Sequence, residues 1–340
     1  MTMKCLIGAM AIALMISDSL DARSPSPIVS AGFIFDTASF PSSHASTIVE
    51  TSTGLVAAWF GGTREGHKDV GIWIARRERE RWTAPVEVAR GEGYPCWNPV
   101  LYQPDEGPLM LFYKAGPNPR EWWGMLMTSP NGGRNWSTTA RLPAGFLGPV
   151  RNKPVAIGDR LLCGSSTEHD GWRVHMEWTD LMGKRWEKAG PLESKPQAFD
   201  AIQPTILAHG PDRIQILCRT RQGVVAQAWS SDMGKTWGPL TATTLPNPNA
   251  GIDAVRLRDG RFLLVYNHTT SGRSPLNVAV STDGVRWGSP FALEDQPGEY
   301  SYPAVIQSRD GKVHVTYTWR RERIKHLILD PAGLLNAQNP

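Results

Sequence analysis

Six polar residues recur at intervals of 49 to 55 residues, each at the start of a stretch with the apolar alternation of a β-strand. They are His44, Asn98, Lys153, Gln203, Asp253 and Tyr302, and each is followed by Pro or Ala. The set supplies an imidazole, a phenol, a carboxylate, an ammonium and two amides, which bind polar ligands and move protons. If the fold gathers the six together, they form the wall of a polar site.

A second set of polar residues follows the second strand-like stretch of most repeats and is rich in arginine. Its members are Arg64, Glu65 and Asp69 in the first repeat, and Arg120, Arg219, Arg221, Arg273, Arg320 and Arg321 further along. A guanidinium group makes planar, two-pronged contacts with a carboxylate. Their accumulation predicts a pocket for an acidic sugar or a similar anion.

The elements that position these residues are marked by a repeated turn. Residues 230–237 read Ser-x-Asp-x-Gly-x-x-Trp, and weaker copies end at Trp136, Trp186 and Trp287, while only the tryptophan remains at Trp82. Ser and Asp side chains bond the backbone of such a turn, Gly takes a positive φ, and Trp anchors it. The tryptophans are 54, 50, 51 and 50 residues apart, which predicts a repeat fold.

Each repeat contains four short strand signals, which favours one antiparallel sheet per repeat. The sixth repeat, from Tyr302 to Leu329, has only three, and residues 31–36 offer a strand that could complete it. A ring closed in this way leaves no long unpaired edge. The sequence therefore predicts an all-β, six-bladed β-propeller whose last blade is closed by an N-terminal strand, with the polar residues around the mouth of its central channel.

The N-terminus reads as a signal peptide over residues 1–22, because an apolar run at 5–16 follows Lys4 and is too short to span a bilayer. Residues 23–340 are then a single propeller domain. We expect an exported protein, periplasmic or extracellular, with no stable membrane anchor.

Composition and charge narrow the function. The 36 Lys and Arg against 32 Asp and Glu give a net charge of +4, and the sequence has no basic run, so nucleic acid is not expected as a partner. Beyond the signal peptide only Cys96, Cys163 and Cys218 occur, without the spacing of a disulfide framework or a zinc site. We expect no cofactor or metal, buried cysteines and a monomer.

The repeated turns resemble the Asp boxes of the sialidase (neuraminidase) superfamily. Residues 59–66, Trp-Phe-Gly-Gly-Thr-Arg-Glu-Gly, and residues 69–73, Asp-Val-Gly-Ile-Trp, are similar to its predicted-neuraminidase branch with BNR repeats. The resemblance covers about residues 40–330.

The resemblance implies roles for several residues. Sialidases hold the substrate carboxylate with three arginines, and Arg219 and Arg273 resemble the second and third of these. Tyr302 resembles the nucleophile and Asp69 the acid/base, with Glu65 in the same loop as a further catalytic candidate. Ligand-binding candidates are Arg64, Asn98, Lys153, Gln203, Asp253 and Arg320.

Two positions depart from the sialidase pattern. His44 stands where the first arginine is expected, and Gln203 stands where a glutamate would assist the tyrosine. A free phenol has a pKa of about 10, so Tyr302 needs another source of activation.

The leading interpretation is an exported sialidase-like glycoside hydrolase that acts on a terminal acidic sugar, with exo-alpha-sialidase as the nearest named activity. Two alternatives use His44: a lyase that removes a proton next to a uronate carboxylate, and a hydrolase of rhamnosyl- or uronate-capped glycans that pairs His44 with Asp69. A third alternative is a propeller that binds glycans without cleaving them.

Overall fold

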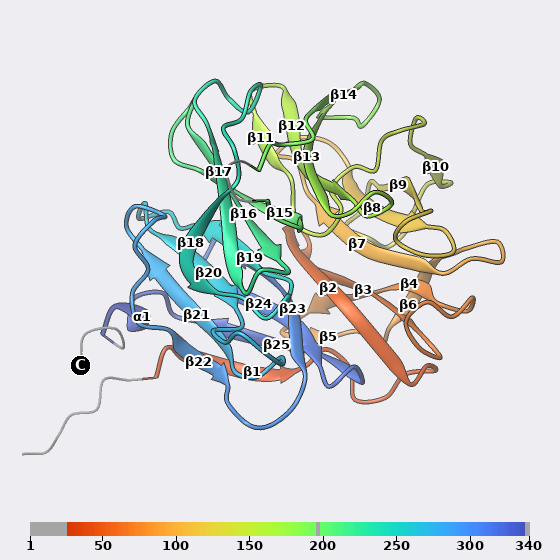
Figure 1. Ribbon diagram of the computed structural model, residues 1–340. Coiled ribbons are helices and arrows are strands. Elements are labelled where there is room, and N and C mark those ends of the chain that lie inside the picture. Colours follow the sequence, from red (N-terminus) through yellow and green to blue (C-terminus); the bar gives the residue numbers. More distant parts are fainter. Residues whose placement is uncertain (1–25, 195–197, 337–340) are drawn as a thin grey trace, which may run out of the picture.

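The computed structural model describes residues 26–194 and 198–336, so the predicted signal peptide lies outside the described residues. Six antiparallel sheets form the blades of a β-propeller (Figure 1), which confirms the predicted fold class. The first strands of the blades meet near the centre, where β2 lies beside β7 and β23, and β19 lies beside β15 and β23.

The strand bounds follow the chain order. Blade one contains β2 (Ser42–Thr51), β3 (Gly54–Gly62), β4 (Gly71–Glu78), β5 (Arg81–Trp82) and β6 (Val86–Arg90), and blade two contains β7 (Cys96–Tyr102), β8 (Leu109–Ala115), β9 (Trp123–Ser129) and β10 (Ala140–Arg141). Blade three contains β11 (Val155–Ile157), β12 (Arg160–Thr167), β13 (Arg173–Asp180) and β14 (Trp186–Ala189), and blade four contains β15 (Ala201–Ala208), β16 (Ile214–Thr220), β17 (Val224–Ser230) and β18 (Thr241–Pro246). Blade five contains β19 (Asp253–Arg256), β20 (Phe262–Tyr266), β21 (Leu276–Ser281) and β22 (Phe291–Glu294).

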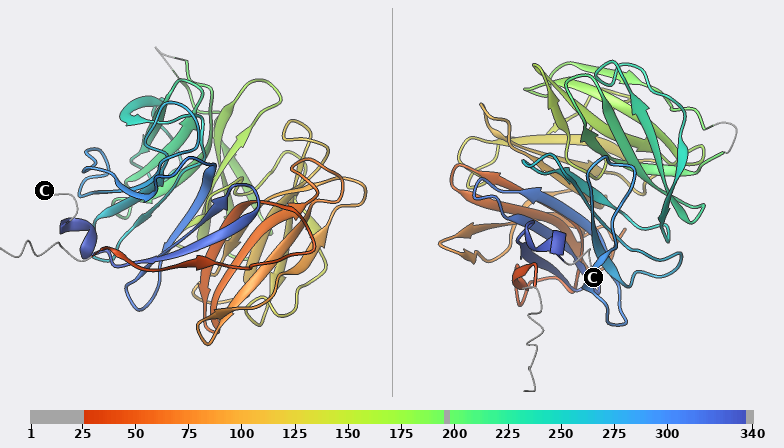
Figure 2. Two further views of the ribbon diagram at one scale, coloured as in Figure 1. Left: turned by 90° about the horizontal axis from the view of Figure 1, so that it is seen from below. Right: turned by 90° about the vertical axis from the view of Figure 1, so that its left-hand side faces the viewer.

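Blade six is closed by the N-terminal strand, as predicted. Its order is β23 (Tyr300–Gln307), β24 (Val313–Trp319), β25 (Arg323–Leu329) and then β1 (Ile28–Phe33), which pairs antiparallel with β25. Figure 2 shows β1 beside the C-terminal strands. After the last of these strands, β25, the chain forms the short helix α1 (Gly333–Asn336). The strand begins and ends three residues earlier than predicted, and Ile34 and Phe35, which follow it, pack in the core cluster that contains Trp59.

The repeated turns join the third and fourth strands of their blades, and each turn rests on the blade before it. In blade four, Ser230 Oγ accepts a hydrogen bond from Gly234 N at 2.8 Å and donates to Asp232 at 2.7 Å. A methyl group on Gly234 would lie 2.9 Å from Leu162 of blade three, and one on Gly183 would lie 2.5 Å from Leu126 of blade two. These turns therefore set the spacing between blades, on the face opposite the starts of the first strands.

Four first strands carry a bulge at the position singled out in the sequence. The strand register shifts between His44 and Thr47, Trp97 and Val100, Ile202 and Thr205, and Ser301 and Ala304. The first extra residue of each bulge has a positive φ, and these residues are Ala45, Asn98, Gln203 and Tyr302. A bulge re-aims side chains at the rim of a sheet.

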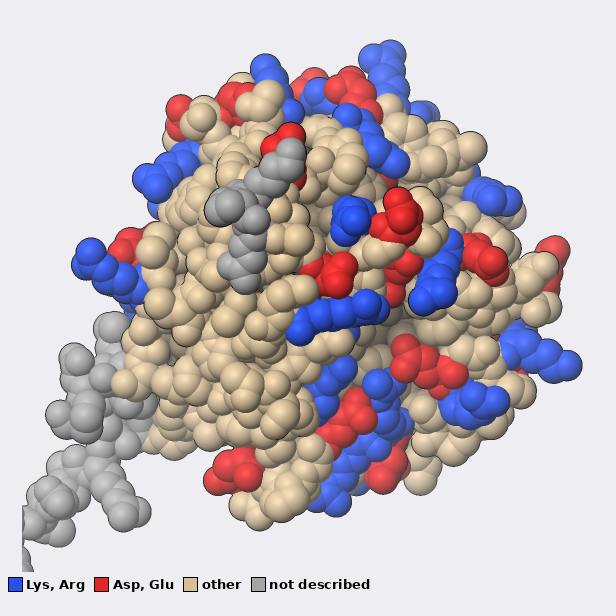
Figure 3. All heavy atoms as spheres, in the orientation of Figure 1, with Lys and Arg blue, Asp and Glu red and all other residues tan. Residues whose placement is uncertain are grey.

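The surface carries charges of both signs, and the cysteines lie in the core. Acidic and basic side chains alternate on the face shown in Figure 3. Cys96, Cys163 and Cys218 are free and buried, as expected. Within residues 26–194 and 198–336, no helix has the length and apolar character needed to cross a membrane.

The turn in blade four generates a prediction about stability. Asp232 accepts hydrogen bonds from Ser230 Oγ, Thr236 N and Thr236 Oγ1, so Asp232→Ala should lower the free energy of unfolding by about 1 kcal/mol. Urea unfolding measures this change. Because the turn lies on the face opposite the polar bulges, a well-folded Asp232→Ala protein with an altered ligand site would contradict the assignment.

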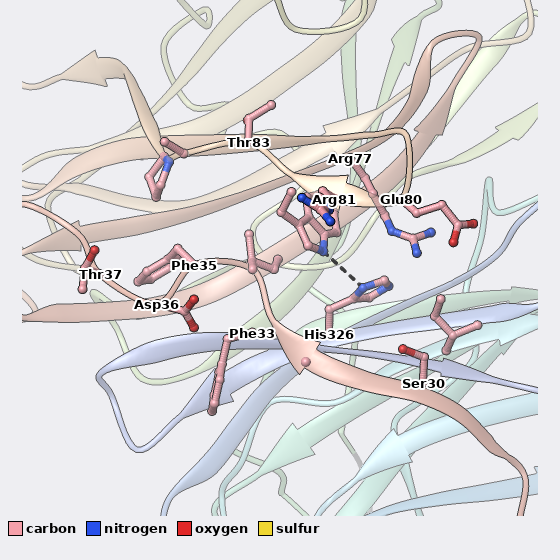
Figure 4. Close-up of a pocket in the computed structure, with 16 residues that line it drawn as sticks. Ser30, Phe33, Phe35, Asp36, Thr37, Arg77, Glu80, Arg81, Thr83 and His326 are labelled. Atoms are coloured by element: carbon pink, nitrogen blue, oxygen red, sulfur yellow. Dashed lines mark hydrogen bonds between the residues drawn. The ribbon is translucent and has the colours of Figure 1, made fainter.

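A chain of hydrogen bonds crosses the seam between blades six and one. Trp82 Nε1 can only donate, and it donates to His326 Nδ1 at 3.3 Å (Figure 4), beside a pocket of about 490 Å³. His326 Nε2 must then donate to His314 Nδ1 at 2.9 Å, and His314 Nε2 to Ser308 Oγ at 3.0 Å. Both imidazoles are neutral in this arrangement.

The seam predicts a pH-dependent stability. Burial and the nearby charge of Arg77 lower the pKa of His314 to about 4 and that of His326 to about 3, while Asp310 opposes the shift at His314. The unfolded histidines titrate near 6.5, so this stabilisation is complete above pH 6.5 and is lost as the pH falls toward 4 and 3.

Urea unfolding at pH 7.0, 5.5 and 4.5 tests this dependence against His326→Gln. The Gln side chain can accept from Trp82 and cannot titrate, so the variant should lose less stability between pH 7.0 and 4.5 than the natural protein does. Equal losses in the two proteins would show that the histidine pair does not control acid stability.

Candidate active site

Tyr302 lies at the centre of the polar site, where the bulge of β23 turns its ring toward arginines from three other segments. Arg219 Nη1 donates to the phenol oxygen at 2.6 Å, and the guanidinium carbons of Arg151, Arg219 and Arg273 lie 5.2, 5.6 and 5.8 Å from the ring centroid. Burial and Glu65 raise the pKa of Tyr302, but Arg219, Arg273 and Gln203 outweigh them and lower it below its usual value. The site stabilises a phenolate.

Arg219, at the end of β16, is held on several sides. Its Nε and Nη2 donate to Asn249 Oδ1 at 3.1 and 2.6 Å, and its Nη1 also donates to Gln203 Oε1 at 3.2 Å. Its guanidinium lies over the ring of Trp172 at 5.1 Å. The group is therefore fixed against the Tyr302 oxygen, and a ligand carboxylate has to displace the Asn249 amide to bind it in two-pronged fashion.

Arg151 is a member of the site that the sequence analysis did not select. It is 1% exposed, donates to Pro303 O at 2.8 Å, and leaves Nε and Nη1 without partners among the described residues. Burial lowers its pKa to about 10, while Asp253 and Tyr302 act in the opposite direction. No motif marks it, because it precedes the short and irregular first strand of blade three.

His44 occupies a buried position behind Tyr302. The two ring centroids are 4.2 Å apart, Nδ1 lies 2.9 Å from Thr318 Oγ1, and Nε2 is buried without a partner in the described chain. Burial lowers its pKa well below the usual value, and four arginines, with Arg321 first, add to this effect. His44 is a neutral ring that supports the Tyr302 face.

The predicted ring of six equivalent residues needs a correction in blade one. The bulge residue equivalent to Asn98, Gln203 and Tyr302 is Ala45, so His44 precedes the ring position by one residue. Blade one has Ser46 where the other three bulges have proline, and the sequence alignment therefore lacked its marker.

The other ring residues have different environments. Asn98 and Gln203 are almost fully buried at their bulges, and Gln203 contacts Arg219. Lys153 and Asp253 pair with each other at 2.9 Å, and Asp253 also accepts from Thr205 Oγ1 and Val305 N. The half-buried Lys153 and the buried Asp253 tie blades three to six together, and their contacts leave little carboxylate surface for a ligand.

The first-blade loop holds three predicted residues, and the structure separates them. Asp69 accepts hydrogen bonds from Thr63 N, Thr63 Oγ1 and His67 Nδ1, and these bonds lower its pKa to about 2 although burial acts against them. Glu65 forms an ion pair with Arg321, and its charge reaches Tyr302. Arg64 is exposed, and its side chain has no hydrogen bond within the described residues.

The two consecutive arginines after β24 point in different directions. Arg320, the predicted ligand-binding residue, stacks on Trp319 at 4.7 Å and donates to Pro297 O, away from Tyr302. Arg321 instead pairs with Glu65 and Glu299 and acts on His44. Both residues have positive φ, a turn geometry that the sequence does not reveal.

Arg273 completes the cationic wall around Tyr302. Its Nη2 donates to Asn249 O at 3.2 Å, and its Nη1 is buried without a partner in the described structure. Arg219 therefore contacts the phenol oxygen from blade four, and Arg273 lies beside the phenol ring from blade five. The arrangement can bind a small anion beside a nucleophilic oxygen.

A half-buried tyrosine among arginines thus lies on a six-bladed propeller of sialidase-like fold. The chain belongs to the family described as BNR repeat-like domain, which matches residues 53–315. No curated protein matches the chain in sequence.

Solved structures share the fold at low sequence identity. A Dyadobacter fermentans protein of unknown function has a TM-score of 0.76 and 16% identity, over 89% of this chain and 98% of that one. The NanB sialidase of Streptococcus pneumoniae has a TM-score of 0.74 and 14% identity, over 91% and 71% of the two chains. An intramolecular trans-sialidase from Ruminococcus gnavus has a TM-score of 0.72 and 12% identity, over 91% and 99%.

The environment of Tyr302 generates a prediction that needs no substrate. The absorbance of tyrosinate should show one titration step at lower pH than the other tyrosines, and Tyr302→Phe should remove it. Arg151→Met takes away a cation 5.2 Å from the ring and should move the step to higher pH. Arg185→Met, on the opposite face, is the matched control; an unchanged step in Arg151→Met would show that Arg151 does not act on the phenol.

Proposed function

We propose that this protein is an exported glycoside hydrolase that removes a terminal acidic sugar from a glycan, with exo-alpha-sialidase as the nearest named activity. The observation that carries the proposal is the 2.6 Å contact of Arg219 with the Tyr302 oxygen inside a group of three guanidinium ions. Such a site both favours the phenolate and attracts the carboxylate of the sugar.

In the proposed reaction the Tyr302 oxygen attacks the anomeric carbon while the bond to the leaving oxygen breaks. The leaving oxygen takes a proton, and water then cleaves the bond between the sugar and Tyr302. Arg273 has an unused buried nitrogen, and Arg219 can exchange Asn249 for the ligand, so these two side chains are suited to hold the carboxylate.

Asp69 is the proposed proton donor, but the hydrogen bonds that it accepts in the free protein favour its ionised form. With a pKa of about 2 it is ionised at neutral pH while Thr63 and His67 bond it. Substrate binding therefore has to break one of these bonds before Asp69 can carry the proton. Glu65, whose charge reaches Tyr302, is the other carboxylate placed for this step.

The cationic surroundings replace the missing glutamate in this proposal. Gln203 can bond Arg219 but cannot take a proton from Tyr302. The alternatives that use His44 as a base are less favoured, because its free nitrogen is buried and its pKa is low.

The decisive experiment incubates the protein with a fluorogenic sialoside and, in parallel, with uronate-containing glycans. We expect reporter release from the acidic sugar, reduced at least about a thousandfold in Tyr302→Phe, as for loss of a nucleophile. Tyr102→Phe, at the far end of β7, is the matched control and should keep full activity.

Other outcomes separate the alternatives. An unsaturated product that disappears in His44→Ala would establish elimination. Binding of the acidic glycan without any turnover would leave a glycan-binding propeller and overturn the proposed hydrolysis.

A further inference from the structure

A groove of about 310 Å³ lies between blades two and three, beside the candidate active site. Its walls come from the loop before β9, the segment after β10, the end of β12 and the outer strand β14. The side chains that bear on its chemistry are Arg120, Trp123, Arg141, Phe146, Glu168 and Lys188.

Three cations of this groove are not neutralised by the protein. Arg120, Arg141 and Lys188 are exposed, and none forms an ion pair with a carboxylate among residues 26–194 and 198–336. Exposed cations that are not held by a carboxylate can accept an anion at little desolvation cost. The groove is therefore open to negative charge.

The cations are combined with aromatic rings. The Arg141 guanidinium lies 4.5 Å from the ring of Trp123, and Lys188 Nζ lies 5.4 Å from the ring of Phe146 and donates to Gly145 O. A guanidinium that rests flat on a ring keeps the N–H groups in its plane available to an anion. Aromatic side chains also offer an apolar surface to the C–H face of a sugar ring.

Glu168 is the one carboxyl group that lines the groove. It accepts a hydrogen bond from Trp172 Nε1 at 3.0 Å. Burial raises its pKa, and the charges of Arg219, Arg221 and Arg120 act in the opposite direction. Its charge is thus compensated by Arg219 and Arg221 on the side of the candidate active site and by Arg120 at the rim, and it forms no ion pair with Arg141 or Lys188 in the described chain.

The groove and the active site share a wall. Trp172, which bonds Glu168, carries Arg219 on its ring at 5.1 Å, and Arg219 contacts the Tyr302 oxygen. On the other side Trp122 contacts Trp97, whose ring lies against Phe60 next to His44. A glycan whose terminal sugar sits at Tyr302 can extend its next unit into the groove.

We infer that the groove binds the unit next to the terminal sugar and that this unit is anionic, so the ligand is a polyanionic glycan bearing carboxylate or sulfate groups. The inference rests on the proposed function, because it extends the substrate of the same site. Arg141 and Lys188 contact the anionic group, Arg120 adds charge at the rim, and Trp123 and Phe146 support the sugar ring.

Binding is measured by calorimetry in a Tyr302→Phe background, which prevents turnover. The probes are tetragalacturonate, in which every unit carries a carboxylate, a chondroitin sulfate tetrasaccharide, in which the unit next to the terminal uronate carries sulfate, and neutral cellotetraose. Arg141→Gln/Lys188→Gln should weaken binding of the charged probes about tenfold, as for two exposed ion pairs. Lys184→Gln/Arg185→Gln, which removes two charges on the opposite face, should leave binding unchanged.

The outcomes keep this inference separate from the proposed hydrolysis. If the natural protein cleaves no acidic glycan but the groove variant still binds the charged probes more weakly than the control variant does, the groove assignment stands and the hydrolysis fails. Equal affinities in the two variants, or cellotetraose binding as tightly as the charged probes, would overturn the groove assignment. A difference between tetragalacturonate and chondroitin sulfate identifies carboxylate or sulfate as the group recognised.

Discussion

The contact between the turn of one blade and the side chains of the blade before it is the constraint on which this ring depends. Gly183 and Gly234 have no side chain, so their turns approach Leu126 and Leu162 at distances that a methyl group would prevent. The approach recurs around the propeller and brings the first strands together at the axis. Closure by β1 and the ion pair of Lys153 with the buried Asp253 then hold the ring as one unit.

A rigid ring allows the active site to concentrate like charges. Arg151, Arg219 and Arg273 come from blades three, four and five, and all lie within 6 Å of one tyrosine ring. Guanidinium groups repel one another, so their grouping is stable only where packing holds them and a polarisable or anionic partner lies between them. In the free protein that partner is the Tyr302 side chain, whose oxygen contacts Arg219; in the proposed function a substrate carboxylate would take over part of this role.

The sequence revealed the architecture because each blade repeats its own signals, and the alignment of repeats located Asn98, Gln203 and Tyr302 at the bulges. It misplaced His44 within the ring because a bulge is a property of strand pairing, which proline marks only in some blades. It missed Arg151 and Asn249 because neither belongs to a motif; their roles arise from channel packing and from a loop that crosses to Arg219. The choice between Arg320 and Arg321 depended on turn dihedral angles, which residue types alone do not specify.

The left-handed backbone at the bulges also restricts how such a site can change over time. Ala45, Asn98, Gln203 and Tyr302 have φ values of 57°, 40°, 58° and 53°, where a branched Cβ is strained. Valine, isoleucine and threonine are therefore poor replacements there, whereas asparagine, aspartate, histidine and unbranched long side chains fit the backbone. Ala45, Asn98 and Gln203 are also buried, so a substitution there has to keep both the backbone geometry and the size of the side chain, whereas the half-buried Tyr302 position is limited mainly by the backbone.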